Sequence, residues 1–180
     1  MVWVTQKTGK KGRGIAPAFS WSICHAQRVK KSIFIVVLGL IVLTALSSAA
    51  QDKGYWPASS NTAKSITGDI AISDAKLVIN FAGFPMVQAR DLKPVEVSAV
   101  FDADINVGRT GFLYHLTVPG TKRFLHHNTL CGTEDTQWMA TFVSGRTLQV
   151  AFFSGSEPPV FTVDAIGKST DLCGTFSYSR

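Results

Sequence analysis

The sequence predicts an all-β domain, a single antiparallel β-sandwich or small β-barrel of about eight strands, preceded by an N-terminal hydrophobic signal or anchor helix. Three features of the chain support this fold class. Short runs of β-branched and aromatic residues recur between turn residues from residue 66 onward. The apolar residues of that region show no helical period over a helical length. An uncharged apolar run, residues 33–46, lies upstream of it.

The apolar run at residues 33–46 has the layout of an export signal. Its 14 residues carry no charge, and they follow the basic residues Arg28, Lys30 and Lys31. The export machinery recognises a basic segment, an apolar stretch of about 7 to 15 residues and small residues at the cleavage site. Because the positive charges precede the apolar run, we expect the chain after residue 50 to cross the membrane.

Two fates of this segment stay open. Cleavage is expected between Ala50 and Gln51, because the small residues Ser48 and Ala50 occupy the positions that signal peptidases read. An uncleaved membrane anchor is the alternative, since residues 33–50 amount to 18 residues and a span needs about 17 to 25. Both fates predict export to the periplasm or the extracellular space, and the second adds attachment to the inner membrane by residues 33–50.

Composition divides the chain into four segments. Residues 1–28 make the basic region longer than that of an ordinary signal, and a start of translation at Val29 is one hypothesis that explains this. The alternative is a basic arm that binds nucleic acid or anionic lipid through Lys7, Lys10, Lys11 and Arg13. The segments are a basic n-region at 1–31, the signal peptide or membrane anchor at 32–50, a linker rich in Gly, Pro and Ser at 51–65, and the exported β-domain at 66–180.

The positive charge of the chain lies in its leader. The formal net charge is +6, but seven of the 18 Lys and Arg residues and none of the 12 acidic residues precede residue 51. Residues 51–180 therefore hold eleven basic against twelve acidic residues, a net charge of −1. They contain no basic stripe with interleaved aromatic residues, so we expect the exported domain to bind no nucleic acid.

Nine segments are expected to be strands, each bounded by turn residues. Tight hairpin turns are expected at Ser73–Asp74 and Ser144–Arg146. Residues 83–94, which contain two prolines, are expected to form the longest irregular connection and to cover one barrel end or a pocket. The predicted strands are 66–72, 76–82, 95–101, 111–118, 122–127, 136–143, 147–153, 159–163 and 172–178.

Alternation along two of these strands assigns side chains to faces of the sheet. Leu77, Ile79 and Phe81 share one face, and this face is expected to point inward. His115 lies between inward positions of a second strand and is expected to point outward. The inward set of that strand is Phe112, Tyr114, Leu116 and Val118.

The cysteines agree with export. Cys24 precedes the apolar run, so Cys131 and Cys173 are the exported pair, and an even pair in an oxidising compartment predicts a disulfide. The bridge would close a loop of 42 residues, which is worth about 4 kcal/mol on the chain-entropy relation. Gly132 and Gly174, which follow the two cysteines, are expected to relieve crowding beside the bridge.

Two groups of residues resemble metal ligands without completing a site. His126 and His127 are neighbours on a predicted strand, so they would point to opposite faces and only one could serve a given metal. Asp102, Asp104 and Asn106 have the alternating oxygens of a calcium loop, but the glycine and the bidentate glutamate of that loop are missing. A polar turn explains these three residues equally well, and no cofactor is predicted.

The sequence contains no recognisable catalytic set. Ser154–Glu157 lacks the glycine spacing and the strand-turn-helix context of a nucleophile elbow. Glu134 and Asp135 are adjacent acids, which turns commonly contain. An enzyme is not predicted, although a hydrolase stays open because convergent triads leave no fixed spacing in sequence.

The carboxyl half, residues 110–180, resembles small exported bacterial β-proteins of unassigned function. The segments that carry the resemblance are residues 128–132, Trp138, residues 148–155 and residues 172–178. It implies export and a β-fold, and it supplies no activity and no catalytic residue.

The expected function is that of a binding module in the cell envelope or periplasm. A rigid β-scaffold with many aromatic residues and no catalytic set favours binding of a small apolar ligand or an envelope protein. Arg109, Tyr114 and Trp138 are the first residues to test, although Trp138 also suits a core. The alternative is a structural or assembly component of the envelope, which would expose an apolar patch or an unpaired strand edge.

Overall fold

The computed structural model describes residues 51–105 and 111–180. The apolar run 33–46, the expected cleavage residue Ala50, and the candidates Asn106 and Arg109 lie outside the described residues. Among the residues that are described, no helix is long and apolar enough to span a membrane.

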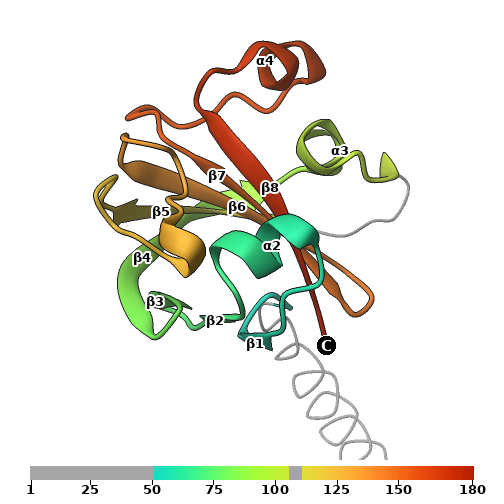
Figure 1. The fold of residues 1–180 in the computed structure, drawn as a ribbon. Helices are drawn as coiled ribbons and strands as arrows, with labels where there is room; N and C mark the ends of the chain where they lie inside the picture. Colours follow the sequence, from blue (N-terminus) through green and yellow to red (C-terminus); the bar gives the residue numbers. More distant parts are fainter. Residues whose placement is uncertain (1–50, 106–110) are drawn as a thin grey trace, which may run out of the picture. The chain divides into compact units, whose positions relative to one another are not determined.

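Eight strands form one antiparallel sheet in which each strand pairs with the next along the chain (Figure 1). The strands are β1 (Gly54–Trp56), β2 (Ile70–Ile72), β3 (Lys76–Ile79), β4 (Ala82–Leu92), β5 (Gly111–Val118), β6 (Thr136–Ser144), β7 (Thr147–Phe153) and β8 (Leu172–Ser179). The remaining elements are helices α2 (Asn61–Ile66), α3 (Pro94–Phe101) and α4 (Val163–Lys168) and the 3₁₀ turn η2 (Leu125–His127).

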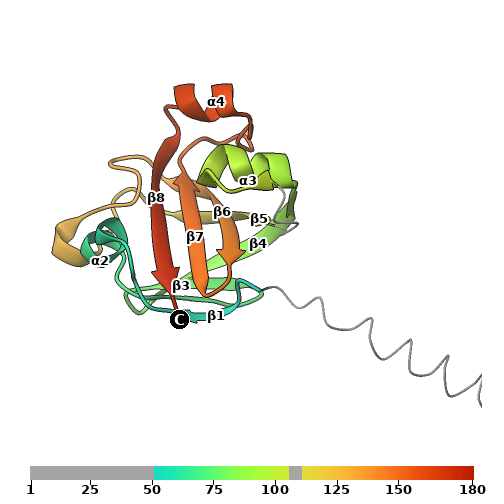
Figure 2. The same cartoon turned by 90° about the vertical axis from the view of Figure 1, so that its right-hand side faces the viewer.

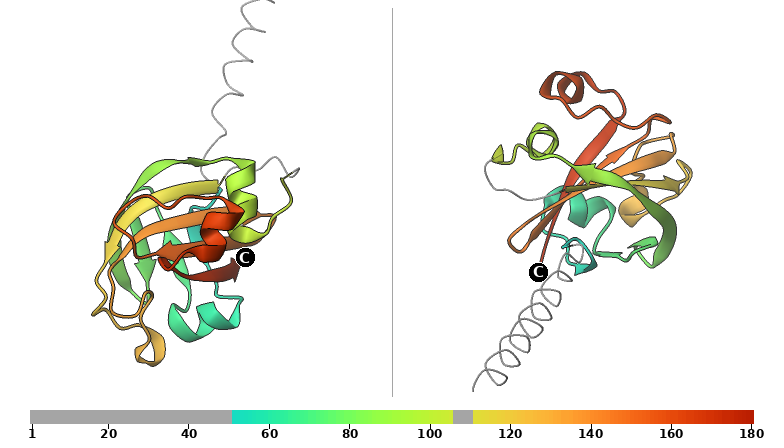
Figure 3. Two further views of the ribbon diagram at one scale, coloured as in Figure 1. Left: turned by 90° about the horizontal axis from the view of Figure 1, so that it is seen from above. Right: turned by 180° about the vertical axis from the view of Figure 1, so that it is seen from behind.

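The sheet is nearly closed as a barrel. The segment after β1 meets β8, where Ala58 and Tyr178 form a β-bridge. The amides of Ser59 and Ser60 both donate to the carbonyl of Ser177, at 2.9 and 3.0 Å. In Figure 3 the long strand β4 curves from β3 round to β5, which brings the first and last strands toward each other. Of the two expected architectures, the structure therefore supports the barrel.

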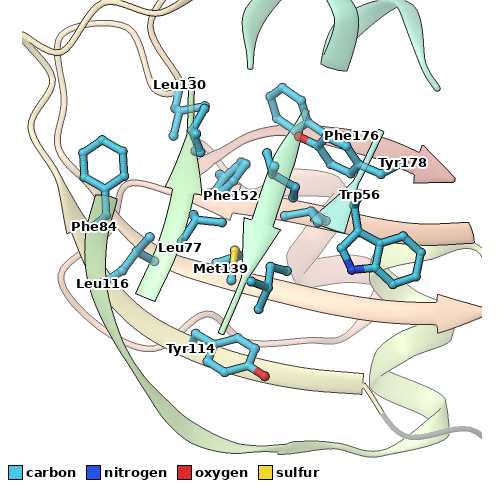
Figure 4. Close-up of a cluster of buried hydrophobic side chains, with 14 of the residues drawn as sticks. Trp56, Leu77, Phe84, Tyr114, Leu116, Leu130, Met139, Phe152, Phe176 and Tyr178 are labelled. Carbon is cyan, nitrogen blue, oxygen red and sulfur yellow. The ribbon is translucent and has the colours of Figure 1, made fainter. Parts of the chain in front are cut away.

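The inside of the barrel is packed with side chains from all eight strands (Figure 4). Trp56, Tyr114 and Tyr178 are its largest members, and each is completely buried. Leu77 and Ile79 face inward as their alternation predicted. The other fully or almost fully buried members include Ile70, Leu116, Met139, Leu148, Val150, Phe152 and Phe176.

A second apolar layer covers the outer face of β5, β6 and β7. Helix α3 lies beside these strands (Figure 2). Its Val97 and Val100 belong to one apolar cluster with Trp138, Phe142 and Phe153 of the sheet. Because both faces of these strands are buried, β6 reads as an almost continuous apolar run rather than as a clean alternation.

Helix α3 replaces the strand that was predicted at residues 95–101, so that prediction was wrong. Pro94 starts the helix with its fixed φ. The Glu96 carboxylate accepts the Lys93 amide at 2.8 Å and binds the Arg90 guanidinium through two bonds of 2.8 and 2.9 Å. These contacts at the helix start outweigh the β-propensity of the valines that follow.

The irregular connection predicted at residues 83–94 was also wrong, since most of it belongs to β4, the longest strand. Pro85 lies where β4 changes partner: it is the last residue paired with β3, and Met86 is the first paired with β5. A central strand is hydrogen-bonded on both sides, and a proline has no N–H to donate to a neighbouring strand. At a change of partner, that loss is tolerated.

Three further predictions need correction. Residues 51–65 are no linker, because they contain β1 and most of α2 and belong to the same compact unit as the sheet. Residues 122–127 form no strand and end in η2. Residues 159–163 lead into α4, whose N-cap Thr162 accepts the Ala165 amide at 3.2 Å.

The other expected strands are confirmed. Of the segment 66–72, only residues 70–72 form a strand, β2. The strands at 111–118, 136–144, 147–153 and 172–179 match their predictions closely, and both expected hairpin turns are present. The strand predicted at 76–82 is shorter and ends at Ile79, because residues 80 and 81 form a turn.

Candidate functional site

Tyr114 and Trp138, the two described residues predicted for ligand binding, lie on opposite faces of the sheet. Tyr114 belongs to the core inside the barrel and Trp138 to the apolar cluster on the outer face. Trp138 also contacts the His115 ring, with 4.8 Å between ring centroids, and His115 points outward as predicted. Tyr114 and Trp138 therefore do not share a binding site.

Tyr114 instead belongs to a buried polar cluster. Its hydroxyl donates to Oδ2 of Asp52 at 2.7 Å, and the Thr141 hydroxyl donates to the same oxygen at 2.8 Å. Lys53 Nζ donates to the Tyr114 hydroxyl at 3.1 Å. Burial and the Asp52 carboxylate raise the pKa of Tyr114, which keeps its hydroxyl protonated as a donor.

Asp52 is completely buried, although its sequence position was assigned to a linker. Its main-chain carbonyl accepts the Trp56 indole N–H at 2.8 Å, while its side-chain Oδ1 has no hydrogen-bond partner. The cluster ties the start of the described chain to β5 and β6. The Tyr55–Trp56 pair was the sequence signal for this packing, because a plain linker needs no large aromatic residues.

The structure joins Cys131 to Cys173 in the predicted disulfide, with 4.9 Å between the two Cα atoms. The expected reason for the glycines beside it was wrong. A Cβ on Gly132 would meet no atom within 4 Å, and one on Gly174 would make an ordinary contact at 3.6 Å with Phe176. Both glycines have positive φ, 66° and 154°, so backbone conformation and not crowding requires them.

The candidate metal ligands do not assemble into a site. Asp102 is exposed and ends α3 in a left-handed conformation, with its amide bonded to the Ser98 carbonyl at 2.9 Å. Asp104 is exposed as well. His126 and His127 lie in η2 and not on a strand. Within residues 51–105 and 111–180, no group of three or more His, Cys, Asp or Glu side chains is placed to hold a metal ion.

An apolar groove on the outer face of β1 to β3 is the strongest candidate site. We call it the hairpin groove, because the β3–β4 hairpin tip forms one of its walls. Its volume is about 310 Å³, at the lower end of the range of ligand pockets. The lining residues are Tyr55, Thr67, Gly68, Asp69, Ile70, Ala71, Val78, Asn80, Phe81 and Leu125.

The floor of the hairpin groove follows from strand register. Tyr55 pairs with Ala71, and Ala71 pairs with Val78, so these three residues form a row across the outer face. On the other face of these strands, the neighbouring side chains point inward and are buried: Trp56, Ile70, Ile72, Leu77 and Ile79. The small Ala71 between two larger residues leaves the row hollow at its centre.

At the hairpin tip, Phe81 combines a left-handed backbone with an exposed side chain. Asn80 and Phe81 are the two turn residues between the paired residues Ile79 and Ala82, with φ of 46° and 63°. Turns with two positive φ values favour Asn and Gly, and a larger residue is strained there. The Phe81 side chain is 99% exposed, so the prediction that it faces inward with Leu77 and Ile79 was wrong.

A second strained segment adjoins the hairpin groove. Leu125 lines the groove, and the next two residues, His126 and His127, have φ of 53° and 63°. A Cβ on Gly68 would come within 3.1 Å of the Leu125 side chain, so a larger residue at 68 would press on that side chain. Strained non-glycine residues concentrate at binding and catalytic sites. Their presence at and beside this groove favours it as the candidate binding site.

One end of the hairpin groove is polar. The Tyr55 hydroxyl donates to Asp69 Oδ2, and the Ala58 amide donates to Oδ1 at 2.9 Å. The hydrogen bond from Tyr55 and then that from Ala58 hold the pKa of Asp69 below its ordinary value. A rigid, ionised carboxylate therefore stands beside the apolar floor.

Two other surface hollows lack this combination of features. One, of about 340 Å³, lies between residues 153–160 and α4, and the charged residues Glu157, Lys168 and Asp171 are among those that line it. The other, of about 310 Å³, lies on the outer face of β4 and β5 beside His115. Neither is lined by a residue in the left-handed region.

The inward position predicted for Phe81 was wrong for a local reason. Phe81 continues the alternation of Leu77 and Ile79, so it read as a core residue. The signal for the true arrangement was Asn80, which accepts a left-handed conformation and so begins a two-residue turn readily.

Comparison with known proteins adds no relative: no protein-family model, no curated protein and no solved structure matches the chain.

Proposed function

We propose that the chain is an exported binding domain that holds a small apolar ligand in the hairpin groove. The observation that supports this most directly is the fully exposed ring of Phe81 on a strained backbone at the groove wall. Left-handed backbone costs an ordinary residue about 1–2 kcal/mol. Phe81 packs against no core that would offset this cost, so burial against a ligand supplies the reason for a phenylalanine there.

The size and lining of the hairpin groove fit a ligand of about one aromatic ring. Its volume is about 310 Å³, and Ala71, Val78 and Leu125 supply an apolar surface. The groove is built on strands and closed by two turns, so little ordering is needed when a ligand binds.

The proposed compartment is the periplasm or the extracellular space. The Cys131–Cys173 disulfide supports this, because disulfides persist in oxidising compartments. The signal or anchor segment at residues 33–50 supports it independently from the sequence.

The proposal is tested by NMR titration of the protein with 2-phenylethanol, a neutral ligand with one ring. We expect shift changes confined to the amides of residues 67–71 and 78–82 and their loss in Phe81→Gly, where the ring is absent and the backbone is relaxed. Val163→Ala is the matched control, since Val163 is exposed on α4 and lines none of the three hollows. Shift changes elsewhere, or changes that persist in Phe81→Gly, contradict the proposal.

A structural or assembly role in the envelope is the second candidate. The exposure of Phe81 and Tyr55 favours it, because aromatic residues on a surface are often covered by a partner protein. This role predicts that Phe81→Gly changes the sedimentation of the native assembly while 2-phenylethanol binds nowhere in the groove.

A further inference from the structure

We infer that the hairpin groove selects an apolar ligand that carries a protonated amine, with the amine at Asp69 and the apolar part against Val78 and Phe81. This inference rests on the proposed function and adds the chemical class of the ligand. The residues involved all line the same groove.

Asp69 provides an uncompensated negative charge. The three ion pairs among the described residues are Lys53–Asp74, Arg90–Glu96 and Lys168–Asp164, and none includes Asp69. Its two hydrogen bonds come from neutral donors, the Tyr55 hydroxyl and the Ala58 amide. A ligand cation would therefore meet a carboxylate whose orientation is already fixed and whose charge is not already paired.

Tyr55 adds a second acceptor for the same cation. Its hydroxyl proton is committed to Asp69, so the lone pairs of the Tyr55 oxygen are free to accept an N–H. An ammonium has three donors, which suits one carboxylate oxygen and one phenol oxygen side by side. The hydroxyl of Thr67 bonds to Tyr178 and to main-chain carbonyls, so it serves the fold and not the ligand.

The groove suits an organic cation better than a metal ion. A calcium ion takes about six to eight oxygen ligands, whereas Asp69 is the one carboxylate among the lining residues. The rest of the lining is largely apolar and would leave a metal ion without ligands. A ligand with an amine at one end and a ring or alkyl group at the other satisfies both parts of the groove.

The experiment compares three ligands of similar shape on the intact protein: 2-phenylethylamine, 2-phenylethanol and 3-phenylpropionate. Exposed ion pairs contribute modestly, so we expect the amine to bind about three- to fivefold more tightly than the alcohol at low salt. The carboxylate should bind more weakly than the alcohol. Salt at about 0.5 M should remove most of the difference between amine and alcohol, because it screens the pair.

Asp69→Asn is the variant that isolates the charge. The amide keeps an acceptor for Ala58 and a polar group for Tyr55, so we expect the variant to bind 2-phenylethylamine no more tightly than 2-phenylethanol. Asp164→Asn is the control, because it removes one negative charge from the exposed surface of α4. It should leave all three affinities as they were.

The outcomes separate the inference from the proposed function. If the alcohol and the amine bind in the groove with equal affinity, the inference is overturned and the proposed function stands. If none of the three ligands shifts the groove amides, the proposed function fails and the inference fails with it. The comparison in the unmodified protein decides between these even if Asp69→Asn does not fold.

Discussion

At the scale of single residues, the most informative position is Phe81. The preceding residue, Asn80, is of a type that adopts positive φ readily, whereas a phenylalanine gains nothing from that conformation. A glycine at 81 would make the turn easier to form. The proposed binding role gives a reason for a phenylalanine at this exposed position.

Replacing Phe81 by glycine should therefore stabilise the domain. Relief of left-handed strain is worth about 1–2 kcal/mol, and the added freedom of the unfolded chain offsets part of it, so we expect a gain of about 1 kcal/mol. Urea unfolding measures this change. A loss of stability would instead mean that the Phe81 ring packs against the domain and is not held free for a ligand.

At the scale of secondary-structure elements, local and long-range information compete. Strands β5, β6, β7 and β8 were predictable because turn residues bound each apolar run and hydrogen bonding to sequence neighbours completes the sheet. Helix α3 was not, because its start depends on Arg90, which lies before the helix and on β4. The pairing of Arg90 with Glu96 exists only once β4 is formed.

The same reason explains why the candidate site was beyond sequence analysis. The hairpin groove joins residues of β1, β2 and β3 to Leu125, which is separated from Val78 by two further strands. No spacing in the sequence indicates that meeting. Tyr114 and Trp138 were predicted to bind a ligand because they are large side chains with a polar group. The alternation of side chains along β5 and β6 places them on opposite faces of the sheet.

The start of α3 should make stability depend on pH. Hydrogen bonding to Arg90 holds the pKa of Glu96 below its ordinary value of 4.5. A carboxyl with a lowered pKa stabilises the folded state above its unfolded pKa, and that contribution is lost as the pH falls through the folded value. Stability should thus begin to fall as the pH drops below 4.5.

Glu96→Gln should make the domain less stable at pH 7 and should flatten this acid limb, as followed by thermal unfolding at a series of pH values. Glu157→Gln is the control, since Glu157 forms none of the ion pairs among the described residues. An acid limb of unchanged steepness in Glu96→Gln would show that other carboxyl groups govern it.

At the scale of the whole molecule, the barrel is held together at two places far apart in sequence. The segment 57–60 is bonded to β8, and the disulfide joins β8 to the loop that follows η2. β8 is therefore held by the segment 57–60 and by the disulfide, both distant in sequence, in addition to its pairing with its sequence neighbour β7. Inward packing of large residues from every strand completes the closure.

Removal of the disulfide should weaken the closed barrel without abolishing the sheet. The bridge links residues 42 apart, so its loss should cost about 4 kcal/mol on the chain-entropy relation. Denaturant unfolding of the double variant Cys131→Ser, Cys173→Ser measures this cost. A change below about 1 kcal/mol would mean that residual structure already restrains the unfolded chain without the bridge.

If the chain is exported and cut after Ala50 as proposed, the burial of Asp52 makes the order of folding and cleavage matter. Asp52 lies two residues beyond Ala50, where the sequence predicts the signal is cut, and it occupies the barrel core with Tyr114 and Thr141. A signal peptidase needs Ala50 and the residues just after it in an extended conformation in its own cleft. A chain that is cut first is released and then folds, whereas a chain that folds first withdraws the cutting position and keeps its anchor. Whether the protein is released or stays tethered would then depend on which is faster, cleavage after Ala50 or folding of the barrel.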